Sequence, residues 1–323
     1  MYFIDCETHL WWPMDDMSYF PNYQKYSATA RGFGSLLKNK EGLLPENRIA
    51  DADHLVKSMD EGGVAQSCVL PEIMLPIAFG HRVRSTNGWV AKEIEKYPDR
   101  LIGVANVGPI TLRGKDALWE LNYLVKERGF RACKIYSPDD CPINDQKNWP
   151  LFEAIQKLGI VLFVHTGIAY LQPGNSAYCH PMLLEKVCCD FPDIPIVAYH
   201  MGYPYYRDLI MLAILNKNLY LGTSLLYQVT RGEFAPGLFN EVMSEAIAFC
   251  GTDKLIWGTD WSGSYVSHKG CAEVLRKFQI PEEYQKKYGC KPITEADREK
   301  WAGLNLAKLL KLKSPIKKIK NKK

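Results

Sequence analysis

Two carboxylates and three imidazoles of this chain stand near the ends of apolar segments, where a metal ion could be bound. They are Glu7, His9, His165, His200 and Asp260. Glu7 and His9 are two residues apart, and side chains two apart on a strand point to the same side. Carboxylate and imidazole groups together suit a divalent transition metal. Because ionisable groups are costly to bury unless they are paired or bound to metal, their joint placement predicts a metal site.

Each of these residues also has a structural explanation when it is taken alone. His200 could be a hydrogen-bonded histidine with no role in binding, and both interpretations stay open. Asp260 could instead cap the N-terminus of a following helix. Four further histidines lie in predicted helices or loops, and we expect them to be surface or structural residues: His54, His81, His180 and His268.

The elements that position these side chains are eight short apolar segments, which we interpret as strands. They are Tyr2–Cys6, Gln66–Leu70, Leu101–Val107, Ala132–Tyr136, Val161–His165, Ile194–His200, Leu219–Thr223 and Leu255–Thr259. Most of the intervening segments carry apolar residues at three- and four-residue spacing, which is typical of helices. The predicted helices are Asp51–Gly62, Gly88–Tyr97, Ala117–Arg128, Trp149–Leu158, Pro181–Phe191, Phe239–Ala248 and a last helix, Thr294–Leu312.

Repeated alternation of strands and helices indicates parallel strands joined by helical crossovers. Eight such units in 323 residues predict an α/β fold of the (β/α)8 TIM-barrel type, in one domain. An open doubly wound sheet is the alternative, and it usually carries a glycine-rich phosphate turn after its first strand. Here the first strand runs into Glu7-Thr8-His9, which favours the barrel.

Two long segments interrupt the repeat, residues 11–50 after the first strand and residues 263–296 after the eighth. Long loops in compact domains are usually lids or binding loops, and both segments leave from the carboxyl ends of strands, the catalytic face of such barrels. The aromatic residues of 11–50 suggest a flat or apolar ligand. We expect the barrel to span residues 1–312 and residues 313–323 to form a basic, flexible tail.

The composition is that of an ordinary globular protein, with 47% apolar and 24% charged residues. No apolar stretch approaches the 18 residues of a membrane span. The N-terminus resembles a buried strand more than a signal peptide, so we expect a cytoplasmic protein without membrane attachment. Ten scattered cysteines form no Cys-x-x-Cys pair, and we expect them to be reduced and to serve packing rather than catalysis.

The net charge of +4 comes from the C-terminus, because residues 308–323 hold eight lysines and no acidic residue. Without these lysines the remaining chain carries a charge of −4. A basic tail can bind nucleic acid or a membrane surface, but a solvated terminus is the simpler explanation. We therefore expect a small-molecule substrate and no nucleic-acid partner.

The order of the motifs resembles the amidohydrolase-related family. The resemblance covers most of the chain apart from the two long segments, and the most similar branch contains aminocarboxymuconate semialdehyde decarboxylase and the hydroxybenzoate decarboxylases. The motifs that carry it are Asp5-Cys6-Glu7-Thr8-His9, the strand that ends in His165, His200-Met201-Gly202 and Gly258-Thr259-Asp260-Trp261. Relatives commonly exchange loops across a two-fold axis, so the resemblance also implies a homodimer.

The resemblance implies a role for each candidate residue. Glu7, His9, His165 and Asp260 would bind one divalent metal ion, Zn(II) or Mn(II), and His200 would lie beside the substrate. Two carboxylates make the site harder than an all-histidine site, which makes Mn(II) a rival to Zn(II).

Two positions bear on how far the family pattern applies. Several decarboxylases of this branch carry glutamate three residues after the histidine of strand six, where this chain has Tyr203. Tyr203 therefore argues against a hydroxybenzoate substrate more than against the metal site. Lys134 is the only lysine near the end of the fourth strand, but it lies two residues before Tyr136 and inside the strand. It is not suited to bridging two metals, which favours a site for one metal.

Decarboxylation without oxidation is the reaction that the resemblance implies first. The substrate would be a small aromatic or enol-containing carboxylic acid. Asp260 would protonate its ring carbon as carbon dioxide leaves, and His200 would hydrogen-bond a substrate oxygen. We expect Tyr203 to line the substrate site, and Arg48 and Arg207 are candidate cationic partners for the substrate.

Two alternatives stay open. The same site could hydrolyse a lactone, an amide or a cyclic diketone, with Asp260 taking a proton from a metal-bound water. The chain could also be a barrel without catalytic function, in which case it would bind no metal.

Overall fold

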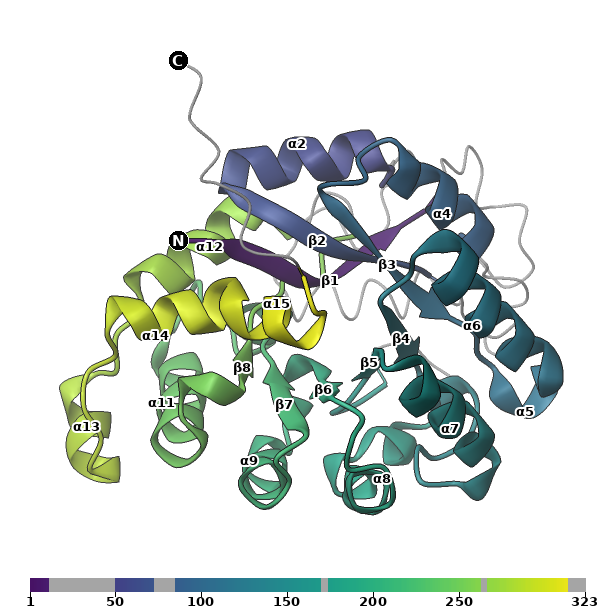
Figure 1. The fold of residues 1–323 in the computed structure, drawn as a ribbon. Helices are drawn as coiled ribbons and strands as arrows, with labels where there is room; N and C mark the ends of the chain where they lie inside the picture. The colour runs from purple at the N-terminus through teal and green to yellow at the C-terminus, as the bar shows by residue number, and fades with distance from the viewer. Residues whose placement is uncertain (12–49, 73–84, 170–173, 263–265, 313–323) are drawn as a thin grey trace, which may run out of the picture.

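Eight parallel strands form the centre of the molecule and pair in chain order from β1 to β8 (Figure 1). This computed structural model describes residues 1–11, 50–72, 85–169, 174–262 and 266–312. Its strands are β1 Phe3–Leu10, β2 Val64–Pro71, β3 Leu101–Asn106, β4 Ala132–Ile135, β5 Val161–Val164, β6 Ile196–Ala198, β7 Leu219–Gly222 and β8 Leu255–Ile256. Each predicted strand overlaps one of them, so the prediction of eight strands is confirmed.

The barrel is nearly closed, because the chain after β8 runs alongside β1. The main-chain nitrogen of His9 donates to the carbonyl of Trp261 (2.7 Å), and that of Cys6 donates to the carbonyl of Trp257 (3.1 Å). Thr8 and Trp261 form a parallel bridge. With helices between successive strands, the structure is the single (β/α)8 TIM barrel that the sequence predicts.

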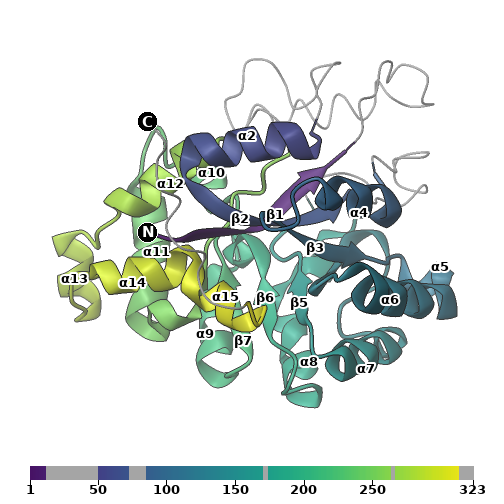
Figure 2. The same ribbon diagram turned by 45° about the horizontal axis from the view of Figure 1, so that its top comes forward.

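Helices cover the outside of the strands and alternate with them along the chain (Figures 1 and 2). They are α2 Ala52–Gly62, α4 Asn87–Glu95, α5 Ile110–Arg113, α6 Lys115–Arg128, α7 Trp149–Leu158, α8 Leu184–Asp190, α9 Tyr206–Leu215, α10 Leu226–Val229 and α11 Gly237–Cys250. The six helices predicted between strands all occur. None of these predicted helices corresponds to α9, which joins β6 to β7.

Helix α2 shows how the sequence sets such an element. Asp51 caps its N-terminus by accepting a hydrogen bond from the main-chain nitrogen of His54 (2.9 Å). Gly63 ends it in the left-handed conformation (φ 67°) that glycine adopts without strain. Leu55 and Met59, four residues apart, are buried against the strands.

The predicted last helix is divided by a π-helical turn. Helix α14 (Glu295–Glu299) is followed by the turn Lys300–Leu304 and by α15 (Asn305–Leu309). Within the turn, Gly303 lies so close to β1 that a Cβ would come 2.3 Å from the carbonyl oxygen of Tyr2. The turn therefore lets the helix pack directly on the N-terminal part of the barrel.

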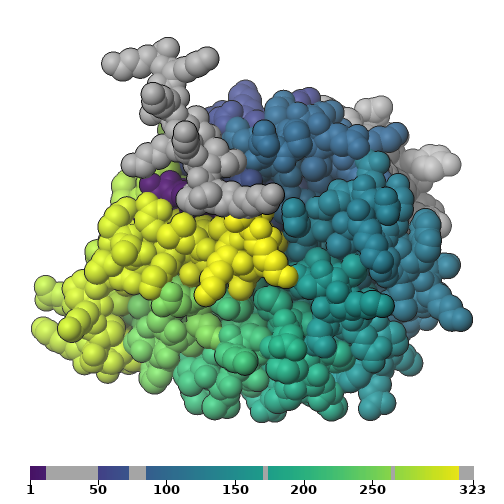
Figure 3. Space-filling view, in the orientation of Figure 1, coloured from purple at the N-terminus to yellow at the C-terminus, as the bar shows by residue number. Residues whose placement is uncertain are grey.

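Helix α15 closes the N-terminal end of the barrel. Leu306, Leu309 and Leu310 are buried in the same apolar cluster as Ile4 and Phe163, which lie inside the barrel. Figure 3 shows the yellow C-terminal helical segment across the middle of this face of the molecule.

The segment 263–296 is not the long loop that the sequence suggests, because much of it is helical. It contains α12 (His268–Lys277) and α13 (Glu282–Tyr288). Most of the other predicted loop, 11–50, and the basic tail 313–323 lie outside the described residues; Trp11 and Ala50 form an antiparallel bridge. Among the helices that the structure describes, none has the length and apolar character needed to cross a membrane.

Candidate metal centre

A bulge in β1 sets the direction of the first two candidate ligands. Asp5 pairs with Ser67 and Thr8 pairs with Val69, so three steps along β1 match two steps along β2. Such a bulge leaves one extra residue on the bulged strand and shifts the alternation of its side chains.

The shift lets one strand serve two purposes. Ile4, before the bulge, and Cys6, within it, belong to the apolar cluster inside the barrel. Glu7, also within the bulge, and His9, after it, approach one another and the end of β8 at the carboxyl rim. Regular alternation from Ile4 and Cys6 would instead have directed Thr8 inward.

Two other candidate residues follow their strands in an unusual backbone conformation. His200, after β6, has a φ of 60°, and Asp260, after β8, has a φ of 61°. Non-glycine residues seldom adopt this left-handed region, and they persist there only where the surroundings hold them. Such strain is common at functional sites, which agrees with a role for both residues.

The structure brings Glu7, His200 and Asp260 together, with possible ligand atoms within 4.8 Å of one another. We call these three residues the metal group. His9 contacts both carboxylates, with its Nε2 3.1 Å from Asp260 Oδ1 and 3.6 Å from Glu7 Oε1. Glu7 is fully buried, whereas the side chain of Asp260 is 19% exposed. Four side chains from β1 and from the ends of β6 and β8 therefore converge at the rim.

His165 lies beside this group but is not one of its three members. Its Nδ1 is 3.0 Å from His200 Nε2, and its Nε2 is 2.8 Å from the carbonyl oxygen of Ile168. Because a carbonyl only accepts, Nε2 carries the proton and Nδ1 presents a lone pair. Burial, with the charges of His200 and Lys134, holds the pKa of His165 well below its usual value. The imidazole is therefore neutral, the form that can bind a metal, and its predicted role as a ligand stays a prediction.

Two residues that the sequence did not assign to the site hold the carboxylate of Glu7. Lys134 Nζ donates to Oε1 and Ser224 Oγ donates to Oε2, each at 2.6 Å. Lys134 does lie inside β4, as expected, but its long side chain reaches the metal group. In the sequence, these two residues can be recognised only by their positions, Lys134 near the end of β4 and Ser224 just after β7.

The charges of the site perturb one another. Burial raises the pKa of Glu7, but the nearby Lys134 and His200 outweigh burial and lower it well below its usual value. Burial and the negative charge of Glu7 raise the pKa of Asp260. For His9, burial and Lys134 act downward, yet its contacts with Asp260 and Glu7 prevail and raise its pKa to about 9.

These observations fit a divalent cation. The protonated imidazole of His9 supplies positive charge between two carboxylates, where a cation would supply more. The Nδ1 atom of His9 is buried and has no hydrogen-bond partner among the described residues. Two carboxylates with imidazoles form a donor set suited to Zn(II) or Mn(II).

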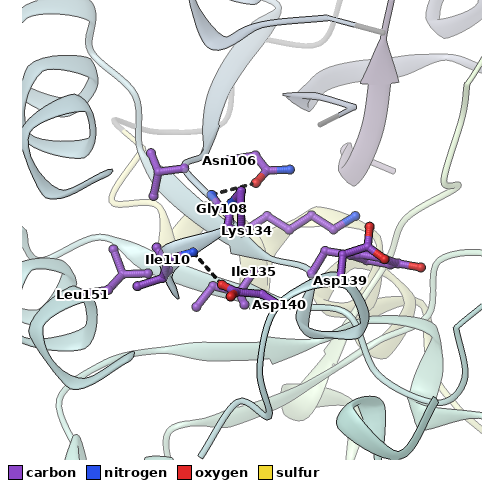
Figure 4. Close-up of a pocket in the computed structure, with 11 residues that line it drawn as sticks. Asn106, Gly108, Ile110, Lys134, Ile135, Asp139, Asp140 and Leu151 are labelled. Atoms are coloured by element: carbon purple, nitrogen blue, oxygen red, sulfur yellow. Dashed lines mark hydrogen bonds between the residues drawn. The ribbon is translucent and has the colours of Figure 1, made fainter. Parts of the chain in front are cut away.

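A pocket lies at the ends of β3 and β4 (Figure 4). Its volume is about 410 Å³, open solvent at the mouth included. It is lined by Asn106, Val107, Gly108, Pro109, Ile110, Lys134, Ile135, Tyr136, Asp139, Asp140 and Leu151. Lys134 belongs both to this wall and to the contacts of Glu7, so the pocket and the metal group are neighbours.

The three other predicted substrate-binding positions differ in their placement. Tyr203 follows the turn that carries His200 and packs half-buried against the core. Arg207 is not brought to the site, because it lies on α9 with its side chain 60% exposed and paired with Glu241 and Glu245. Arg48 lies outside the described residues.

Comparison with known proteins gives a family. The family model described as amidohydrolase matches residues 4–312. A curated relative, protein fluG of Emericella nidulans, is 23% identical over 130 residues, which are 38% of this chain and 14% of that protein. The chain therefore spans only a small part of the length of this relative.

Three similar solved structures share the barrel fold at low identity. An uncharacterised TIM-barrel protein of Bordetella bronchiseptica has a TM-score of 0.69 and 18% identity, with 96% of this chain and 99% of that chain covered. A dihydroxybenzoic acid decarboxylase of Polaromonas sp. JS666, with bound manganese and the inhibitor 2-nitroresorcinol, has a TM-score of 0.61 and 19% identity. The match covers 96% of this chain and 97% of that chain. A probable 2-pyrone-4,6-dicarboxylic acid hydrolase of Acinetobacter baumannii, with citric acid bound, has a TM-score of 0.57 and 16% identity. The match covers 96% of this chain and 100% of that chain.

Proposed function

The chain belongs to the amidohydrolase family, and we propose that it is a metal-dependent decarboxylase. Its substrate would be a small aromatic or enol-containing carboxylic acid. One observation carries the proposal: the carboxylates of Glu7 and Asp260 meet with His9 and His200 at the carboxyl rim of the barrel. This rim is where TIM-barrel enzymes have their active sites.

Glu7, His9 and Asp260 would hold the metal ion, together with an imidazole from His165 or His200. When bound, a Zn(II) or Mn(II) ion would act as a Lewis acid and orient the carboxylate and an adjacent oxygen of the substrate. The manganese in the similar dihydroxybenzoic acid decarboxylase supports Mn(II) as one of the two choices.

Asp260 is suited to carry the proton that decarboxylation requires. Its side chain is 19% exposed at the rim, where it can reach a bound substrate. Before a cation binds, burial and the charge of Glu7 raise its pKa above that of an ordinary aspartate. As the bond to the carboxylate breaks, its electron pair stays on the ring carbon, which takes the proton of Asp260, and carbon dioxide leaves. Solvent then restores the proton. His200 would donate a hydrogen bond to the substrate oxygen next to the leaving carboxylate.

The test is the release of carbon dioxide from hydroxylated benzoic acids by the metal-loaded enzyme. We expect release from at least one acid, and we expect Asp260→Asn to lower kcat at least about a hundredfold, as loss of a general acid does. Metal content measured on both proteins separates loss of the acid from loss of the metal. An active Asp260→Asn variant, or the absence of release from every acid in the presence of bound metal, would contradict the proposal.

Hydrolysis of a lactone, amide or cyclic diketone is a second candidate, and Tyr203 favours it. Several decarboxylases of the family branch carry glutamate at this position, and this chain lacks that carboxylate. Asp260 would then accept a proton from the attacking water, and His200 would polarise the carbonyl. Turnover of a pyrone lactone or a 1,3-diketone without any release of carbon dioxide would establish this candidate over the first.

A further inference from the structure

Asp5 is a fully buried carboxylate that joins β1 to the end of β8. Its Oδ1 accepts hydrogen bonds from the main-chain nitrogens of Glu7 (2.9 Å) and Thr259 (3.0 Å). Its Oδ2 accepts from the hydroxyl of Thr259 (2.5 Å). Glu7 is a proposed ligand and Thr259 immediately precedes another, Asp260. One carboxylate therefore fixes the main chain at both carboxylates of the metal group.

His268, the first residue of α12, fixes Asp5 from the other side. The imidazole is fully buried, with Nε2 3.2 Å from Asp5 Oδ2 and Nδ1 2.8 Å from the hydroxyl of Ser58 in α2. With the Ser58 hydroxyl donating to Nδ1, the proton of His268 lies on Nε2 and faces the carboxylate. The N–H is not aligned for a regular hydrogen bond, so the contact is mainly electrostatic.

The main chain of His268 is also held in place. A Cβ at Gly62, the last residue of α2, would come 2.8 Å from the main-chain carbon of His268, so the two helices touch here. Arg276 of α12 donates to the carbonyl of Gly62 (2.8 Å). The position of the imidazole is therefore fixed by packing as well as by its polar contacts.

We propose that Asp5 and His268 are positioning residues of the metal centre and couple α12 to it. The inference rests on the proposed function, since it requires a metal at Glu7 and Asp260. Stability alone is a poor explanation for this arrangement, because removing a carboxylate from water costs free energy that its buried partners must offset. Groups that orient the residues around a metal typically change its affinity by 10- to 100-fold when they are lost.

Manganese affinity of the full-length chain is the measurement that tests this inference. After removal of metal with a chelator, Mn(II) is titrated against a competing fluorescent chelator, and the melting temperature of the metal-free protein is recorded for each variant. We expect His268→Phe, which keeps a ring but removes both nitrogens, to weaken Mn(II) binding by about 10- to 100-fold. His268→Gln retains a donor and should recover part of the affinity.

Leu275→Ala is the matched control. Leu275 lies on the same helix and is buried, but its side chain is apolar and leaves Asp5 and His268 in place. We expect this variant to lower the melting temperature while Mn(II) affinity stays within about twofold of that of the unchanged protein, since distant and independent sites act additively.

Asp5→Asn gives a second test that conserves shape. The amide keeps an oxygen at the Oδ1 position for Glu7 and Thr259 but places a donor opposite His268. We expect a loss of affinity smaller than that of His268→Phe but larger than threefold.

Unchanged Mn(II) affinity in His268→Phe overturns the inference; if that variant does not fold, unchanged affinity in His268→Gln and Asp5→Asn does so. Failure of the unchanged protein to bind Mn(II) or Zn(II) contradicts the proposed function instead.

Discussion

The two ends of the barrel interior are built from the same strands but hold opposite kinds of side chain. At the N-terminal end, Ile4, Val161 and Leu306 are buried among apolar neighbours, and α15 closes the opening. At the C-terminal end, Glu7 and Lys134 are just as inaccessible, yet both are charged. The bulge in β1 marks the change from one environment to the other.

Stability and binding are concentrated at different ends of the barrel. Apolar burial stabilises by roughly 25 cal/mol per Å², so the N-terminal end contributes favourably in its own right. Burying charge costs free energy unless each charge has a partner. The C-terminal end is therefore stabilised by ion pairs such as that of Lys134 with Glu7. A bound cation would change the electrostatic balance among these charges.

Lys134→Met should give the largest effect, because it leaves Glu7 buried without its cation. Removing one partner of a buried ion pair costs about 3–5 kcal/mol in the free energy of unfolding. Saturating Mn(II) should restore part of this loss by supplying positive charge to Glu7. Chemical denaturation of the metal-free and metal-loaded proteins measures both quantities.

Lys254→Met is the control for that prediction. Lys254 donates to the carbonyls of Asn216, Lys217 and Leu219, away from the rim. Mn(II) should stabilise this variant no more than it stabilises the unchanged protein. Equal metal rescue of the two lysine variants would show that the ends of the barrel do not differ as described.

Leu306→Ala tests the opposite end. The side chain is 1% exposed in the interior cluster, so its truncation should lower the free energy of unfolding by about 2–4 kcal/mol. Mn(II) affinity, measured under conditions where the variant is folded, should stay unchanged. A loss of affinity above about threefold would mean that the two ends are coupled, against the additivity expected of distant sites.

The pH dependence of metal binding should be confined to the charged end. His9 is raised to a pKa of about 9 without metal, so below this pH a metal that binds its imidazole must displace a proton. Affinity for Mn(II) should therefore rise with pH between about 6.5 and 9, by up to tenfold per unit. Titrations in buffers of different ionisation enthalpy would count the released proton. His9→Gln should release none, and release equal to that of the unchanged protein would rule out His9 as its source.

Thiol modification should have the smallest effect. Burial holds the pKa of the Cys6 and Cys68 thiols well above the usual value and raises that of Cys133 to about 12. Such thiols are protonated and unreactive near neutral pH, whereas Cys189 is exposed. Iodoacetamide at pH 7 should modify Cys189 first and leave activity within about twofold, since reactivity follows the exposed thiolate. Inactivation in step with the modification would assign a cysteine to the site.

The sequence predicts the barrel well because its strands are continuous apolar segments, and buried parallel strands have this pattern. It also predicts that Glu7, His9, His165, His200 and Asp260 meet at one rim, where the structure places His165 beside the other four. The bulge that directs Glu7 and His9 inward could not be predicted, because it depends on the register between β1 and β2. Strand alternation correctly predicts that Glu7 and His9 point to the same side, but it does not determine which side faces the barrel.

The differences between prediction and structure have a common physical origin. Lys134 lies inside β4 as predicted, but its side chain is long enough to contact Glu7, 127 residues earlier in the chain. The charge of Arg207 makes it a candidate, but acidic residues of α11 neutralise that charge on the outer surface. Helix α12 lies in a segment whose sequence suggests a loop. Each contact is set by tertiary packing between distant segments, which a single sequence does not display.

Metal content decides whether Glu7 and Asp260 belong to a metal centre. Elemental analysis of the purified protein, and of a Glu7→Gln/Asp260→Asn double variant with a matching circular dichroism spectrum, should be made before and after incubation with Mn(II). We predict about one equivalent of Zn or Mn in the unchanged protein and less than about a tenth in the double variant, since such sites bind metal tightly through deprotonated ligands. An unchanged protein that binds no metal, or a double variant that binds a full equivalent, would contradict a metal centre at these residues.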